Sequence, residues 1–472
     1  MPLNLSAKYI AEHTPRPGDA IFTRRDFLHR TGMGMGALTL GTMLSDLLGP
    51  DAVAASPLAP RLPHFAAKAK HVIHIFASGG PSHVDTWDPK PMLTKFDGKE
   101  ISAGTNGKGS VAFASPFKFT KRGKSGIEVS EVFPKLGECV DDMAIIRSMW
   151  TDIPAHEISQ RFINTGSLQL PKPSMGAWVV YGLGTDNQNL PGFIALGGKP
   201  EWRQASFLPG VYQGCHVNYS STMSLDQVLL NIKNNFINAG EQRQQLDLAH
   251  QLNAIHAASL HRDVQLEARI EAFEMAFKMQ TEAIAAFDIN QEPGAIRELY
   301  GRSEMGAKLL VARRLVERGV RFVQIEHGGW DHHARLDLNL SRSTAQIDQP
   351  AAALICDLKE RGLLDSTLIV WVGEFGRTVT RDRNGNENAG RDHNAKAFCC
   401  WMAGGGVKGG MVYGATDEFG ARAVENRCHV HDLHATILAL LGFDHEKLQY
   451  RYNGRDFRFT DNYGKVVKDI IA

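Results

Sequence analysis

The chain has 472 residues, of which 43% are hydrophobic and 22% are charged, a composition typical of globular proteins. Its 52 lysines and arginines nearly balance its 51 aspartates and glutamates, so no net charge draws nucleic acid or an acidic membrane surface. We therefore exclude nucleic acid as a partner and expect one large globular domain.

The first 55 residues have the features of an export signal. Residues 23–28 read TRRDFL, and a weakly apolar, glycine-rich run over 32–48 leads to small residues. This order is typical of a twin-arginine signal peptide. The alternatives are an amphipathic first helix with a chance arginine pair, or a membrane span, which glycines and Asp46 disfavour because a span needs about 20 apolar residues. We predict a signal over 1–55 read by the twin-arginine translocase, a linker over 56–70, no stable membrane span, and a periplasmic or extracellular protein.

Short apolar runs alternate with helical patterns through the remaining chain. Near-continuous apolar runs are typical of strands covered on both faces, as in parallel sheets. These runs lie at 71–77, 144–146, 320–325, 367–372 and 397–402. Helical spacing between them, as at 305–318, predicts a three-layer α/β/α sandwich with a mostly parallel sheet over 71–472. A polar stretch with helical periodicity at about 225–287 predicts a helical insertion.

The six cysteines do not form a disulfide framework in so long a chain. We expect all six to be structural, as small hydrophobic side chains. None begins a Cys-x-Pro-Ser-Arg pattern.

Acidic and imidazole side chains follow or flank the predicted strands in four separate segments. Ligand groups in parallel α/β sheets collect where strands end, and divalent metals take Asp, Glu and His ligands from several segments. We therefore predict a metal site at this sheet edge. Its candidate residues are His83, Asp85, Asp331, His333, Glu374 and His393.

Five motifs carry a resemblance to a known exported family. They are GGPSHVDTWDPKP at 79–91, GGWDHH at 328–333, GEFGRT at 373–378, GRDH at 390–393 and AGGGVKGG at 403–410. The chain resembles the family catalogued as domain of unknown function number 1501, often labelled sulfatase-like. The resemblance runs from about residue 71 to the end and includes the twin-arginine start. That family is similar in fold to the alkaline phosphatase superfamily.

The resemblance implies a divalent cofactor, one or two ions of Zn, Ca, Mg or Mn. By its pattern Asp331 and His333 follow a middle strand and His393 precedes a later one, as metal ligands. Glu374 stands where the superfamily has an Asp-His pair, so the histidine is missing. The first strand lacks the usual Asp, and Asp85 is the nearest carboxylate.

Residues 148–156 replace the segment in which the superfamily carries its nucleophile. His156 lies there as a catalytic candidate, and Ser148 or Thr151 could attack the substrate. Water activated by the metal is the alternative nucleophile. Two further catalytic candidates, Arg377 and Arg391, could bind an anionic ester by paired hydrogen bonds, or form ordinary salt bridges with neighbouring carboxylates.

These features predict an exported, metal-dependent hydrolase of phosphate or sulfate esters. Its substrate would be an anionic small molecule or a polysaccharide ester. A non-catalytic binding or structural module on the same fold is the main alternative. A metal-dependent isomerase or transferase, classes that the superfamily also includes, is a third.

Overall fold

The computed structural model describes residues 57–103, 110–169, 172–228, 238–259, 264–382 and 389–472. The predicted signal peptide lies outside these described residues. Within the described ranges, no helix is both long and apolar enough to cross a membrane.

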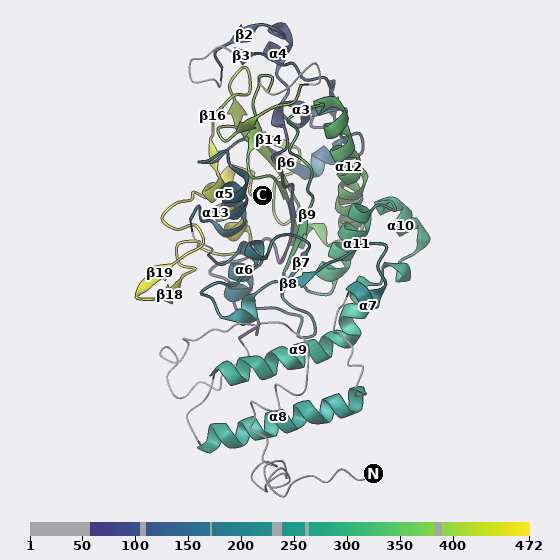
Figure 1. Cartoon of the computed structure of the whole chain (residues 1–472), viewed down its shortest axis with the longest axis vertical. Coiled ribbons are helices and arrows are strands. Elements are labelled where there is room, and N and C mark those ends of the chain that lie inside the picture. Colours follow the sequence, from purple (N-terminus) through teal and green to yellow (C-terminus); the bar gives the residue numbers. More distant parts are fainter. Residues whose placement is uncertain (1–56, 104–109, 170–171, 229–237, 260–263, 383–388) are drawn as a thin grey trace, which may run out of the picture.

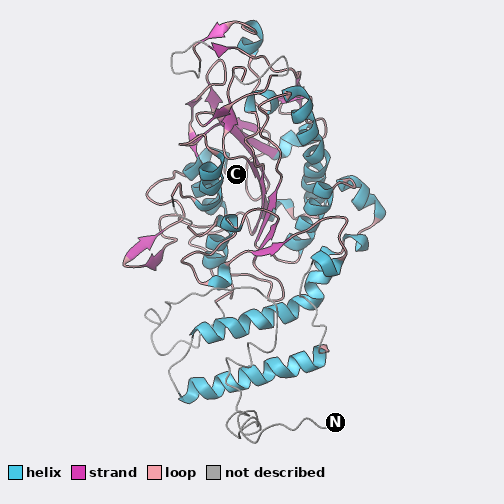
Figure 2. Cartoon of the chain, viewed as in Figure 1, coloured by secondary structure: helices cyan, strands magenta, loops and turns pink. Residues whose placement is uncertain are grey.

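A nine-stranded sheet forms the centre of the molecule (Figures 1 and 2). Its order is β14 (Met411–Tyr413), β6 (Met143–Trp150), β13 (Phe398–Ala403), β10 (Thr367–Val372), β1 (His71–Phe76), β9 (Phe322–Glu326), β7 (Phe193–Leu196) and β8 (Cys215–Val217), and β17 (Cys428–His429) also pairs with β6. Strands β10, β1, β9, β7 and β8 are mutually parallel, whereas β13 runs antiparallel to both β10 and β6. The predicted mostly parallel sheet is confirmed.

Helices cover both faces of this sheet and form two hydrophobic cores. On one face, Ile73 and Ile75 of β1 pack in a core with α11 (Glu304–Glu317) and α12 (Leu336–Glu360). On the other, Val72 and Phe76 pack in a core with α5 (His156–Thr165), α6 (Met175–Leu183) and α13 (Val430–Leu440). Alternate residues of one strand thus face opposite cores, as the two-residue period of a strand requires. The predicted three-layer sandwich is confirmed.

The predicted helical insertion contains α7 (Leu225–Val228), α8 (Ala239–Ser259) and α9 (Val264–Phe287). Helices α8 and α9 lie against each other at one end of the molecule (Figure 1). The short helices α3 (His83–Thr86), α4 (Pro91–Lys95) and α10 (Gly294–Tyr300) complete the set of α-helices in the described residues.

Short two-stranded sheets and several 3-10 segments lie outside the main sheet. The pairs are β2 (Glu100–Ile101) with β3 (Ser110–Val111), β4 (Phe119–Arg122) with β5 (Ile127–Ser130), β11 (Gly376–Arg377) with β12 (His393–Asn394), β15 (Ala415–Thr416) with β16 (Ala423–Glu425), and β18 (Tyr450–Tyr452) with β19 (Arg455–Phe457). The 3-10 segment η2 (Leu136–Asp142) leads into β6. Because β1, β9 and β10 are adjacent and parallel, the loops that follow them meet at one sheet edge.

Candidate metal centre

The loop after β9 carries Asp331 and is tied to the loop after β1. Trp330 donates its backbone N–H to Ser78 O at 3.3 Å, and its indole is fully buried. Gly79 has φ +119°, and a Cβ there would lie 2.7 Å from Asp331 N and 2.8 Å from Trp330 N. Only glycine has the conformation and the space for this contact. The two loops can therefore approach closely enough to present Asp331 at the sheet edge.

Two other segments bring histidines to Asp331. His156 is the first residue of α5, and its ring lies against His393, with centroids 4.3 Å apart. His393 opens β12, where its register partner is Arg377 of β11. The β11–β12 pair therefore places one histidine and one arginine beside the same carboxylate.

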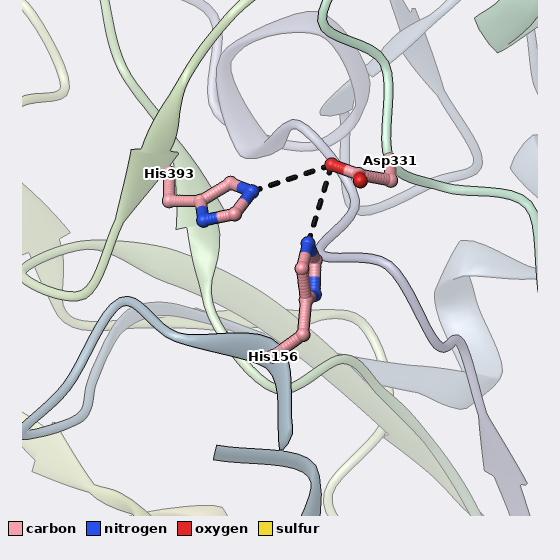
Figure 3. Close-up of side chains that lie close together, drawn as sticks. All are labelled: His156, Asp331 and His393. Carbon is pink, nitrogen blue, oxygen red and sulfur yellow. Dashed lines mark hydrogen bonds and ion pairs between the residues drawn. The ribbon is translucent and has the colours of Figure 1, made fainter. Parts of the chain in front are cut away.

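Three imidazole nitrogens converge on one oxygen of Asp331. Its Oδ1 lies 2.9 Å from His333 Nε2, 3.3 Å from His156 Nε2 and 3.3 Å from His393 Nε2. The Nε2 atoms of His333 and His393 are 3.0 Å apart. Figure 3 shows His156 and His393 pointing toward Asp331 from different elements. We call Asp331, His156, His333 and His393 the three-histidine cluster.

The other nitrogen of each imidazole is held by an acceptor. His156 Nδ1 lies 2.6 Å from Glu374 Oε1, and His333 Nδ1 lies 2.6 Å from Asp382 Oδ2. His393 Nδ1 lies 3.0 Å from the carbonyl oxygen of Pro154. A carboxylate or a carbonyl has no proton to give, so each Nδ1 must donate. In the neutral tautomer, each Nε2 is therefore an unprotonated acceptor that faces the cluster.

In this protonation state, the three-histidine cluster contains more hydrogen-bond acceptors than donors. Three Nε2 lone pairs and a carboxylate oxygen crowd together, and His156 Nε2 forms no hydrogen bond although it is buried. The guanidinium of Arg377 offsets part of this repulsion, since its Nη2 donates to Asp331 Oδ1 and its Nη1 lies 3.4 Å from His333 Nε2. Protons or a bound cation would offset the rest.

The ionisation of the cluster reflects the same crowding. Burial disfavours the charged imidazole of His156, yet its contacts with Asp331 and Glu374 raise its pKa to about 9. Burial favours the neutral acid of Asp331, but His156, His393 and Arg377 hold its pKa well below the usual range. Both pKa shifts favour positive charge on the imidazoles beside the Asp331 carboxylate.

A second group of ligand atoms adjoins the first. His333, Asp392 and His393 offer one ligand atom each, all within 4.8 Å of one another, as do His156, Asp331 and His393. His393 belongs to both groups, and Asp392 is exposed. The side chain of Asp331 is 47% exposed, so the cluster is open to solvent on one side.

The buried side chain of Arg377 holds the Asp331 carboxylate in place. Its Nη2 donates to Asp331 Oδ1 at 2.5 Å, and its Nε donates to Gly80 O at 2.8 Å. Its Nη1 donates to Arg391 O at 3.1 Å, and the side chain is 1% exposed. The guanidinium donors of Arg377 are thus engaged and buried, and they hold the Asp331 carboxylate.

Four other predicted site residues make different contacts. Asp85 and Arg391 form a fully buried ion pair, with 2.6 Å between Asp85 Oδ2 and Arg391 Nε. His83 Nε2 contacts Gly420 O at 2.7 Å. Glu374 is buried, accepts from the N–H of Gly79 at 2.9 Å, and contacts the cluster through His156. The structure thus brings Asp331, His333 and His393 together with His156, and places Glu374 behind them.

The two hydroxyl candidates for the nucleophile are buried. Ser148 donates to Asn426 O at 2.7 Å, and Thr151 is 3% exposed. His332 points away from the cluster, since its Nε2 contacts Gly329 O at 2.8 Å. Sequence reasoning missed Asp382, which follows no predicted strand and belongs to no quoted motif.

An open cleft of about 500 Å³ lies along α5, which begins at His156. Its walls carry charges of both signs, from Glu157, Arg161, Lys199, Pro200, Glu201 and Gln204. Lys199 donates to Gln160 Oε1 at 2.9 Å, and Gln160 donates to Glu374 Oε1 at 3.1 Å. The cleft wall is therefore linked by hydrogen bonds to the support of His156.

Comparison with solved structures finds distant likenesses. The PsFucS1 sulfatase from Pseudoalteromonas sp. is 13% identical over 80% of this chain and 68% of its own, with a TM-score of 0.34. The lipoteichoic acid synthase LtaP from Listeria monocytogenes is 10% identical over 85% and 78%, with a TM-score of 0.33. A magnesium-bound mutant of TAB5 alkaline phosphatase is 11% identical over 80% and 99%, with a TM-score of 0.31. At TM-scores this low, the likenesses carry no functional inference.

No curated protein matches the sequence. A family model described as "Protein of unknown function (DUF1501)" matches residues 69–471.

Proposed function

The chain belongs to the DUF1501 family, whose description names no activity. From the geometry of the site, we propose that the protein is a metal-dependent hydrolase of phosphate or sulfate esters. The observation that carries this proposal is the three-histidine cluster. Three Nε2 atoms face one carboxylate oxygen, and every Nδ1 is engaged behind them.

The donor set fits a divalent transition metal. Zinc binds neutral imidazole and carboxylate in tetrahedral sites, and catalytic sites leave a position open for water or substrate. Metal-bound histidines characteristically donate their other N–H to a carboxylate or a carbonyl. Glu374, Asp382 and Pro154 O make these contacts here. Zinc therefore suits this cluster better than calcium or magnesium, which prefer oxygen ligands.

The ligand set proposed here is His156, Asp331, His333 and His393. The adjoining group of His333, Asp392 and His393 offers room for a second ion that shares His393. Asp85 and Arg391 are left out because they pair with each other. His83 is left out because its Nε2 contacts Gly420 O, although its buried Nδ1 has no hydrogen-bond partner.

A bound cation would supply Lewis acidity that activates water at neutral pH and neutralises charge on an ester oxygen. Asp331 contributes a negative charge whose position Arg377 fixes. His156 is held by Glu374, so its Nε2 stays aimed at the centre. Water is the proposed nucleophile because Ser148 and Thr151 are buried.

We propose that the cleft along α5, which is linked to the cluster only through Gln160 and Glu374, holds a polar alcohol part of the ester. Arg161 and Lys199 lie among its lining residues, and Glu157 and Gln204 add hydrogen-bonding groups. Charged and polyhydroxylated leaving groups, including sugar esters, match such walls better than apolar ones do.

Metal analysis and hydrolysis of nitrophenyl phosphate and nitrophenyl sulfate test the proposal. We expect a stoichiometric transition metal and turnover that Asp331→Ala abolishes. Asp337→Ala removes an exposed carboxylate on α12 and serves as the matched control, with unchanged turnover. Metal binding without turnover of any ester would favour the non-catalytic module, and absence of metal binding would end the metal proposal.

Export through the twin-arginine route is proposed separately from residues 23–28. A reporter fused behind residues 1–70 should leave the cytoplasm, and replacing Arg24 and Arg25 by lysine should retain it there. Equal export of both fusions would contradict this route.

A further inference from the structure

Two cysteines that are distant in sequence face each other outside the metal centre. Cys139 lies in η2, Cys356 lies near the end of α12, and their Sγ atoms are 3.8 Å apart. Cys139 is 6% exposed, whereas Cys356 is exposed. The exposed thiol of Cys356 therefore lies outside the apolar core, unlike Cys139, Cys399, Cys400 and Cys428. An exposed thiol against a second thiol is a reactive arrangement.

Polar contacts before and after the two cysteines join η2 to α12. Asp348 accepts from Leu136 N at 2.8 Å, one helical turn or more before the cysteines. Lys359 pairs with Asp142 at 2.7 Å, just after them. Asp348, Cys356 and Lys359 recur on one face of α12 because they are separated by multiples of three or four residues. The facing segments are thus aligned along the whole contact.

The Sγ atoms of Cys139 and Cys356 need to move only a short distance to form a disulfide. A disulfide needs about 2.05 Å between sulfurs, so the Sγ atoms must close by about 1.8 Å. Cys139 Sγ also lies 3.9 Å from Ala352 O, one turn of α12 before Cys356. Side-chain rotation is the motion available, since Asp348 and Lys359 hold the backbone segments together.

We propose that Cys139 and Cys356 form a disulfide when the folded protein meets a disulfide oxidant, covalently joining η2 to α12. This modification site goes beyond the proposed hydrolase function and does not depend on it.

Cys356 is the attacking thiol. The contact with Cys139 lowers the pKa of Cys356 to about 7, which favours its thiolate form. Its thiolate attacks one sulfur of glutathione disulfide, whose S–S bond breaks and releases one glutathione thiolate. The product is a mixed disulfide on Cys356.

Cys139 then resolves the mixed disulfide. Its hydrogen bond to Cys356, burial and the nearby thiolate raise its pKa in the reduced protein. The first and third causes vanish once Cys356 is capped. The Cys139 sulfur attacks Cys356 Sγ, loses its proton to solvent and expels the second glutathione thiolate. Two cysteine thiols are oxidised by two electrons, and one glutathione disulfide is reduced to two glutathiones.

Peptide mapping of the full chain treated with glutathione disulfide tests the proposal. Trypsin releases Cys139 in residues 136–147 and Cys356 in residues 343–359, with one cysteine in each peptide. We expect these peptides to appear linked without reductant, at their summed mass less two hydrogens, and to separate with reductant. The buried Cys399 and Cys400 should stay reduced.

Two serine variants separate the steps. Cys139→Ser should keep glutathione on Cys356 as a lasting mixed disulfide, and Cys356→Ser should give neither adduct nor link at residue 139. The oxidised protein should melt several degrees higher than the reduced one, because the bond joins residues 217 apart, and Cys356→Ser should remove that shift. A lasting glutathione adduct on Cys356 in the unsubstituted protein, or a link to another cysteine, would overturn the proposal.

Discussion

Two aspartates that follow neighbouring strands have opposite surroundings. Asp85, after β1, is fully buried and takes two hydrogen bonds from Arg391, at 2.6 and 3.0 Å. Asp331, after β9, is about half exposed and faces three imidazole nitrogens as well as Arg377. Sequence patterns place both in one metal site. The structure separates them.

The difference lies in how donors and acceptors are matched. The guanidinium of Arg391 gives its hydrogens to Asp85 and to the carbonyl oxygens of Thr378 and Phe113, so this pair is complete without a cation. Around Asp331, by contrast, acceptors outnumber donors. This difference is why we propose Asp331, and not Asp85, as a metal ligand.

Removing one member of the buried pair should cause the largest loss of stability. Asp85→Ala leaves the charge of Arg391 buried and unpaired, which costs about 3–5 kcal/mol. Urea denaturation of the variant and the unsubstituted protein measures this loss. Metal affinity of the folded variant should stay unchanged, and a tenfold loss would show that Asp85 belongs to the metal site after all.

Removing a cluster histidine should instead act on metal binding. His393→Ala deletes a ligand shared by both groups, and metal affinity should fall by more than about 100-fold. Calorimetric titration with zinc measures the change. His216→Ala, at an exposed histidine of β8, is the control and should bind as the unsubstituted protein does.

The support behind the cluster should have a smaller effect. Glu374→Gln keeps the shape of the side chain but weakens its hold on His156 Nδ1, and metal affinity should fall about 10- to 100-fold. Asp382→Asn behind His333 is the matched variant and should behave alike. Unchanged affinity in both would show that the Nδ1 contacts do not tune the site.

A buried imidazole without partners should have an effect that appears only when the pH is lowered. Neither nitrogen of His74 in β1 has a hydrogen-bond partner, and burial lowers its pKa from 6.5 to about 4. Between pH 6.5 and about pH 4, the His74 imidazole is protonated in the unfolded chain but not in the folded chain. The free energy of unfolding therefore decreases as the pH is lowered, by up to about 1.4 kcal/mol per pH unit. Urea unfolding between pH 7 and 4 should show a shallower slope for His74→Leu, and equal slopes would contradict the assignment.

Much of the fold follows from the sequence. Apolar runs predict β1, β9, β10 and β13 because strands covered on both faces must be apolar throughout. The short β7 and β8 give too little pattern to predict. The antiparallel direction of β13 has no signal either, since an apolar run reads the same in both directions.

The candidate site is harder to predict for a physical reason. Strand topology shows that Asp331, His333 and His393 could approach one another. It does not show that His332 turns away toward Gly329 O, or that Arg391 engages Asp85. The roles of Asp382 and Pro154 arise only when distant segments meet, because a hydrogen bond to Nδ1 leaves no trace in residue spacing.

Anomalous diffraction at the zinc edge, from crystals grown with zinc, tests the three-histidine cluster most directly. We predict a peak about 2.0–2.2 Å from an Asp331 carboxylate oxygen and from the Nε2 atoms of His156, His333 and His393. No peak among these four side chains, or a peak only beside Asp85, would contradict the account.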